Sequence, residues 1–294
     1  MTDTLASLRR KIDSAADLHA VVRTMKALAG SSIGQYEKSV RALADYDRAV
    51  ALGLKVSLSQ IEAAAFTEPE QAAGQSSTGA VVFGSDQGLV GQFNDVIADY
   101  AIEKLASLPG TAHVWAVGER VRARLLDADL AVMDVFAVPA SVAAITTLVG
   151  QILLRTESLR ARDRAAGLQL FYNRPTEGAI YTPVDRRLLP LDAHWRGERM
   201  KLPWPARSPP EVIGVATQTL EALIGEYLFV SLFRACAESL ASENASRLAA
   251  MQRAEKNIDE LLEGMNAAFH RLRQSSIDEE LFDVVSGFEA LRSR

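Results

Sequence analysis

The two ends of the chain carry apolar repeats that are too long for an ordinary globular helix. Apolar residues recur every three or four positions over residues 4–55 and again over residues 210–292. A periodic segment much longer than about 25 residues favours a coiled coil. One segment opens the chain and the other closes it, so they can pair within the chain only by folding back on each other. The repeats therefore predict an antiparallel pair of long helices with a separate globular body between them.

The charges of the two segments favour this pairing. Residues 1–55 hold nine Lys/Arg and six Asp/Glu, whereas residues 210–294 hold eight Lys/Arg and fourteen Asp/Glu. Opposite net charges favour one orientation of the paired segments more than they strengthen the pairing, because an exposed ion pair contributes only about 0–1 kcal/mol to stability.

Both repeats contain local departures from the apolar pattern. Gly30 and Gly34 weaken the first helix, since a glycine inside a helix costs about 1 kcal/mol relative to alanine. They mark either a bend or a close approach of another backbone. Glu243 and Arg247 interrupt the second stripe and predict that this helix meets a polar environment midway.

Residues 75–210 alternate short apolar strands with amphipathic helices. After a loop over 69–79, we expect strands at 80–83, 113–117, 130–136, 168–172 and 179–184, and helices at 92–108, 119–126 and 141–160. Strands that alternate with helices predict a parallel or mixed sheet covered by helices, an α/β fold. The proline-rich stretch 186–210 is expected to be irregular. The predicted domains are a helix over 1–58, an α/β body over 75–210 and a helix over 211–294.

Composition argues against several classes of function. The net charge of −5 gives no support for a nucleic-acid partner. No run approaches the roughly 18 apolar residues of a membrane span, so direct membrane insertion is not expected. The single cysteine, Cys236, cannot form an intramolecular disulfide. The four histidines are scattered without metal-ligand spacing, so no metal or cofactor is expected.

One glycine-rich loop, GSDQGLVGQFN (84–94), lies between an expected strand and an expected helix, the usual context of a phosphate-binding turn. Its glycines at 84, 88 and 91 match neither the dinucleotide fingerprint nor the P-loop, and it holds no Lys or Arg. A tight turn in which Asp86 bonds the backbone is the favoured interpretation. A nucleotide-binding α/β enzyme with helical extensions and a coiled-coil scaffold protein remain the alternative functions.

Near the end of the second repeat, polar side chains could serve a partner. Arg273 and Gln274 fit an ordinary solvated helix face, although a planar guanidinium could also clamp a partner carboxylate. The acidic run 278–280 is interpreted as a solvated face, because adjacent helical residues diverge by about 100°. His19 and His270 are interpreted as surface or packing residues.

Four segments together resemble the gamma subunit, the central-stalk rotor, of F-type ATP synthases. They are LRRKIDSAADLHAVVRTMKAL (8–28), GSDQGLVGQFN (84–94), LFRACAESLASENASRLAAM (232–251) and RLRQSSIDEELFDVVSGFEAL (271–291). Their order and spacing follow that family over nearly the whole chain. The most specific is the third, with Ser-Glu-Asn at 242–244 in an alanine-rich helix.

The resemblance implies a definite architecture and role. The terminal helices would form an antiparallel coiled coil inside a ring of alternating alpha and beta subunits. A Rossmann-like domain, which binds no nucleotide, would sit as a foot against the epsilon subunit and the membrane c-ring. The subunit would not be catalytic alone. It would couple ion translocation to ATP synthesis or hydrolysis by rotation, as a peripheral protein on the cytoplasmic face of the bacterial inner membrane.

The resemblance also carries residue roles. Arg273 and Gln274 match an Arg-Gln pair that contacts a beta-subunit loop, and Met25 and Lys26 match a Met-Lys pair that faces the acidic beta-subunit lever loop. The chain departs from the family at Gly30–Gly34, where relatives carry a basic patch, and at Gln87, where arginine is common. These departures resemble the alternate, sodium-translocating F-type ATPases of some bacteria.

Overall fold

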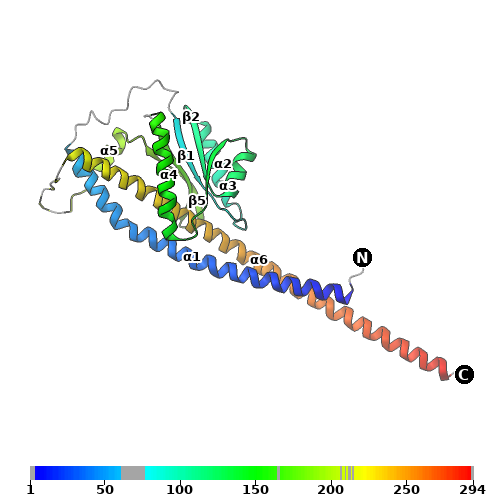
Figure 1. Cartoon of the computed structure of the whole chain (residues 1–294). Coiled ribbons are helices and arrows are strands. Elements are labelled where there is room, and N and C mark those ends of the chain that lie inside the picture. Colours follow the sequence, from blue (N-terminus) through cyan, green and yellow to red (C-terminus); the bar gives the residue numbers. More distant parts are fainter. Residues whose placement is uncertain are drawn as a thin grey trace. The chain divides into compact units, whose positions relative to one another are not determined.

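The computed structural model describes residues 4–60, 77–163, 166–205, 207–208, 210, 213 and 215–292, with side chains as far as Ser286. Two long helices, α1 (Leu5–Ser59) and α6 (Ala216–Arg292), begin and end the described chain, as the apolar repeats predict (Figure 1). None of the helices in these ranges is long and apolar enough to cross a lipid bilayer. The predicted loop over 69–79 lies outside the described residues up to 76, and β1 begins at 77.

The chain divides into two compact units, which are treated separately. Unit 1 comprises 1–29 and 248–294, and unit 2 comprises 30–247. Each unit takes part of α1 and part of α6. The division therefore cuts across both helices and does not follow the three domains expected from the sequence, which stay a prediction.

Unit 1 is an antiparallel helix pair. Val22 of α1 and two α6 residues, Met251 and Ile258, form its buried apolar cluster, and Met25 packs partly buried against them. His19 of α1 faces Asp259 of α6, and Lys26, seven residues later in α1, faces Glu255, four residues earlier in α6. The two helices therefore run in opposite directions. The seam is stabilised by apolar contacts and bordered by ion pairs.

Unit 2 contains a five-stranded mixed sheet in the order β3-β2-β1-β4-β5. Its strands are β1 (Ser77–Phe83), β2 (Thr111–Val117), β3 (Val132–Phe136), β4 (Gly167–Thr176) and β5 (Ala179–Leu189). The first four strands run parallel, and β5 pairs antiparallel to β4. Because β1 lies in the centre, its apolar run is buried on both faces, which explains why it lacks alternation.

Helices cover both faces of this sheet. Side chains of α2 (Phe93–Ala106) and α3 (Glu119–Asp127) pack with Ala80 and Val82 of β1. The opposite face, with Val81 and Phe83, packs against α4 (Val142–Arg162) and the unit 2 segments of α1 and α6 (Figure 1). Successive residues of β1 thus contribute to two different cores, as strand geometry requires.

The prediction of an irregular stretch over 186–210 is wrong in part. Strand β5 continues to Leu189, and a short helix, α5 (Ala193–Met200), follows it. The Asp192 side chain starts α5 by accepting a hydrogen bond from the Trp195 amide at 2.7 Å. The prolines flank these two elements, which is why proline content alone did not reveal them.

Helix α1 continues without a break through Gly30 and Gly34. A methyl group added to either glycine would meet no described atom within 4 Å. Among the described residues, neither glycine therefore makes room for a closely packed neighbour.

Candidate functional site

The predicted Met-Lys contact lies in unit 1, close to the last α1 residue of that unit. Met25 is half-buried in the apolar seam, whereas the Lys26 ammonium forms an ion pair with Glu255 of α6. The hydrogen bond from Lys26 holds the pKa of the Glu255 carboxyl below its usual range, and the charges of His19 and Arg23 add to this effect. Lys26 therefore already has an intramolecular carboxylate partner.

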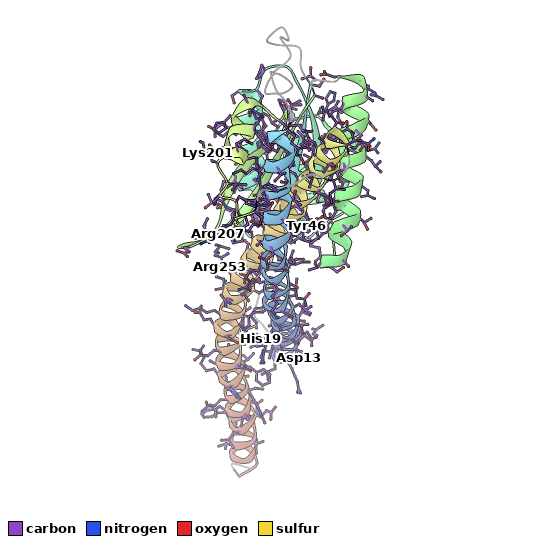
Figure 2. The ribbon with its side chains drawn as sticks, turned by 90° about the vertical axis from the view of Figure 1, so that its left-hand side faces the viewer. Asp13, His19, Tyr46, Lys201, Arg207 and Arg253 are labelled. Atoms are coloured by element: carbon purple, nitrogen blue, oxygen red, sulfur yellow. The ribbon has the colours of Figure 1, made fainter. Side chains whose placement is uncertain are left out.

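Two further basic residues of α1 lie along the same side of the helix pair. Arg23 Nε is 4.0 Å from Glu255 Oε1, and His19 Nε2 is 3.2 Å from Asp259 Oδ1. Figure 2 labels His19 on this helix. The charge split that the sequence predicted as favouring pairing is thus present as individual cross-helix ion pairs.

The predicted Arg-Gln pair lies elsewhere on unit 1. Arg273 and Gln274 are exposed residues of α6, 18 or more residues beyond Glu255. At 1.5 Å rise per residue, this separation corresponds to about 27 Å along the helix. The structure therefore does not bring the two predicted contacts together, and a partner that uses both must reach along α6.

Beyond Arg273, the apolar stripe of α6 extends past the described part of α1 in unit 1. The first turns of α1 lie against Leu261–Ala268 of α6, where both helices line an open groove. The later apolar side chains have no segment of α1 opposite them in the described part of unit 1. They are 47–72% exposed: Ile277, Leu281, Phe282, Val284 and Val285.

The glycine-rich loop of unit 2 is bonded to its own chain. The Ser85 amide donates to Asn94 Oδ1 at 2.9 Å, and Asp86 accepts from the amides of Glu119 at 3.0 Å and Val138 at 2.9 Å. A Cβ at Gly84 would lie 2.3 Å from that of Val121, so this glycine permits close packing of α3. The tight-turn interpretation, with Asp86 bonding the backbone, fits this geometry.

Glu243 and Arg247 are largely buried, on a stretch of α6 that also carries the buried polar side chains of Ser242, Asn244 and Ser246. Their side chains are only 6% and 13% exposed, and Arg247 Nη2 donates to Glu243 Oε1 at 2.7 Å. Burial raises the pKa of Glu243, and the neighbouring Arg247 charge opposes that rise. The two charges tolerate burial because they neutralise each other.

The ATP synthase family model matches residues 4–291, nearly the whole chain. This chain belongs to the ATP synthase gamma family. It is 26% identical to an ATP synthase gamma chain of Clostridium pasteurianum, with 99% of each chain covered. It is 27% identical to that of Moorella thermoacetica, covering 98% of this chain and 99% of that relative.

Solved ATP synthase structures share the fold. A chain of the Euglena gracilis mitochondrial ATP synthase, in a structure of its OSCP/F1/c-ring, has a TM-score of 0.64 at 15% identity, covering 98% of this chain and 95% of that one. A chain of the rotor of the same enzyme has a TM-score of 0.62 at 14% identity, covering 93% and 98%. The predicted fold class of an α/β body with long terminal helices is confirmed.

Family membership gives this gamma-family chain its role. It is a rotary central-stalk subunit of an F-type ATP synthase, and it is a non-catalytic component of that complex. It is therefore a peripheral component of an ATP synthase assembly and works together with the other subunits of that assembly.

Proposed function

We propose that unit 1 is the part of this stalk that turns inside a ring of alternating alpha and beta subunits. The α/β body would be the foot that meets the epsilon subunit and the membrane c-ring, on the cytoplasmic face of the bacterial inner membrane. In this proposal the functional domains remain 1–58, 75–210 and 211–294.

The observation that carries the proposal is the exposed apolar end of α6. Ile277, Leu281, Val284 and Val285 follow a spacing of four, three and one, so they share one side of the helix. A soluble chain rarely leaves a contiguous patch of large apolar side chains in water unless a partner covers it. An apolar collar inside the alpha–beta ring would bury these side chains and still let the helix turn.

Two polar contacts would act in addition to this apolar end. Arg273 is exposed, so its planar guanidinium could clamp a carboxylate of a beta-subunit loop. Gln274 would donate a hydrogen bond from its side-chain amide to the same loop. Met25 and Lys26 would face the acidic lever loop of a beta subunit. Because Glu255 already pairs with Lys26, that loop would compete with an internal carboxylate.

Rotation would then act through differential affinity. An asymmetric shaft presents different side chains to the three beta subunits, so each nucleotide site is held in a different state of affinity. The ion carried by the membrane ring is not encoded in these contacts. Membership of the sodium-translocating branch stays a prediction from Gly30–Gly34 and Gln87.

The test is reconstitution of this chain with alpha and beta subunits, followed by size-exclusion chromatography and ATP-hydrolysis assays. We expect a stable complex with the wild-type chain. Replacing Arg273 and Gln274 by alanine removes a charge-assisted contact of about 1.5–3 kcal/mol and should slow hydrolysis by roughly tenfold or more. Arg160→Ala, an exposed arginine of α4, serves as the control and should have no effect. A monodisperse chain that binds neither subunit would refute the proposal.

A further inference from the structure

Segment 231–246 of α6 is unusual because it is both buried and polar. Its buried polar side chains are exposed by 9% or less: Ser231, Ser239, Ser242, Glu243, Asn244 and Ser246. Apolar contacts are non-directional and tolerate sliding, whereas a buried hydrogen bond requires one distance and one orientation. This segment therefore has the means to fix the position of α6 on the α/β body, within unit 2.

The most direct of these bonds joins α6 to the glycine-rich loop. Ser246 Oγ donates to the carbonyl oxygen of Val90 at 2.6 Å, and both residues are buried, at 5% and 1% exposure. The carbonyl belongs to the loop between β1 and α2, which in nucleotide-binding α/β folds is the phosphate-binding turn. In this chain the same loop binds a helix of its own subunit.

The loop is itself held rigidly by the α/β body. Asp86 bridges the first turn of α3 and the residue Val138 that follows β3, and Asn94 ties the start of α2 to Ser85. Between these attachments, Leu89 and Gly91 adopt positive φ angles of 63° and 57°, which turn the loop sharply on either side of Val90. The Val90 carbonyl is thus a fixed acceptor that belongs to the body.

Two turns earlier on α6, the Glu238 carboxyl is an electrostatic neighbour of Tyr172 of β4. Burial, followed by the Glu238 charge, raises the pKa of Tyr172 to about 12, so the hydroxyl stays protonated at neutral pH. The eight residues from Glu238 to Ser246 span about 12 Å of helix, so the two contacts resist both sliding and turning.

We propose that Ser246 and Tyr172 are positioning residues that lock α6 to the α/β body in one angular register, with the glycine-rich loop acting as the clasp. This proposal rests on the function proposed above. A stalk that transmits torque must not twist at the junction between its shaft helix and its body, and α6 is one continuous helix from Ala216 to Arg292.

The test compares two double variants of the full chain in the ATP synthase holoenzyme, reconstituted in sealed vesicles. Ser246→Ala with Tyr172→Phe removes the Ser246 hydroxyl, which bonds the Val90 carbonyl and also neighbours Tyr181 of β5, together with the Tyr172 hydroxyl beside Glu238. Its control is Ser242→Ala with Tyr100→Phe. The Ser242 hydroxyl is buried without a hydrogen-bond partner among the described residues, and the Tyr100 hydroxyl bonds Asp185 at 2.6 Å within the body.

The readout is the number of ions pumped per ATP hydrolysed, measured beside thermal stability and subunit content. We expect the first variant to keep ATP hydrolysis within about twofold and to lose at least half of its pumping per ATP. The control variant should pump as the wild type does, even where its melting temperature falls. Equal numbers of ions pumped per ATP by all three enzymes, or an equal loss in both variants, would overturn the proposal.

Single variants keep the test decisive where the double variant does not assemble. Ser246→Ala and Tyr172→Phe are then measured alone against Ser242→Ala and Tyr100→Phe, and unchanged pumping in both of the first pair overturns the proposal. Failure of the wild-type chain to join alpha and beta subunits is a different result, because it refutes the proposed function itself.

Discussion

Replacing Arg247 by leucine is expected to destabilise unit 2 by about 3–5 kcal/mol, the usual cost of removing one partner from a buried ion pair. The Glu243 carboxyl is only 6% exposed, and its Oε1 accepts from Arg247 Nη2 at 2.7 Å. Without Arg247 this carboxylate has no opposing charge within its site. The penalty therefore comes mainly from the Glu243 charge that remains, and less from the lost packing of the arginine stem.

That origin gives the loss a pH dependence with a definite sign. Burial raises the folded-state pKa of Glu243, and Arg247 opposes the rise, so the leucine variant raises this pKa further. A group whose pKa is raised on folding contributes stability that is fully present below its unfolded pKa of about 4.3 and is lost as pH increases through the folded pKa. The deficit of the variant should therefore be largest at neutral pH and should shrink toward pH 4.

Tryptophan fluorescence in urea provides the assay. All three tryptophans, Trp115, Trp195 and Trp204, lie in unit 2, so the signal reports that unit specifically. With m of about 2–3 kcal/mol/M, the expected loss moves the midpoint by roughly 1–2 M.

Two further variants isolate the charge. Adding Glu243→Gln to the leucine variant removes the unpaired carboxylate and should restore most of the stability. Arg234→Leu is the control, because its partner Asp47, at 2.8 Å, remains 27% exposed and can be hydrated, so the loss should be smaller. Equal losses in the single and double variants, or a deficit that does not change with pH, would refute this reasoning.

Three other outcomes are expected. Gly34→Ala and Gly30→Ala should each stabilise α1 by up to about 1 kcal/mol, measured by thermal circular dichroism, because the added methyl meets no described atom within 4 Å; destabilisation by both would contradict that open space. Lys26→Met should lower the free energy of unfolding at pH 7, and the difference from the wild type should vanish in acid. The pKa of Glu255 is depressed on folding, so the stability that its ion pair contributes is present above the unfolded pKa and is lost as pH falls. A difference that persists at pH 2 would exclude the ion pair as its cause. Cys236 is buried and its pKa is raised by burial, so alkylation by iodoacetamide should await unfolding in urea, and rapid labelling of the native chain would contradict its position.

Much of the fold could be read from local pattern because local pattern is set by backbone geometry. The apolar repeat required α1 and α6, and the alternation of strands with helices required a covered sheet. Helix α5 escaped prediction because its start depends on the Asp192 cap inside a proline-rich stretch. The antiparallel pairing of β5 also could not be read, because strand direction follows from the tight turn at Gly178, whose φ is 88°.

The candidate site divides in the same way. The family resemblance suggested Met25, Lys26, Arg273 and Gln274 as contact residues, but it could not tell that Lys26 already has a carboxylate partner across the helix pair. The unequal lengths of the two repeats indicate that part of α6 extends past α1. A periodic stripe looks the same whether its partner is the same chain or another, so the pattern could not tell which apolar side chains stay exposed.

The two long helices, the α/β class between them and the gamma family could be predicted from the linear chain, since periodicity and motif order are properties of it. What the polar positions do became clear only from the packing of distant segments. It placed Glu243 and Arg247 in the interior as a pair, and it set Ser246 against the carbonyl of Val90. The reason is physical: whether a charge or hydroxyl is solvated or bonded depends on which distant segment lies against it, and one chain's pattern does not specify that contact.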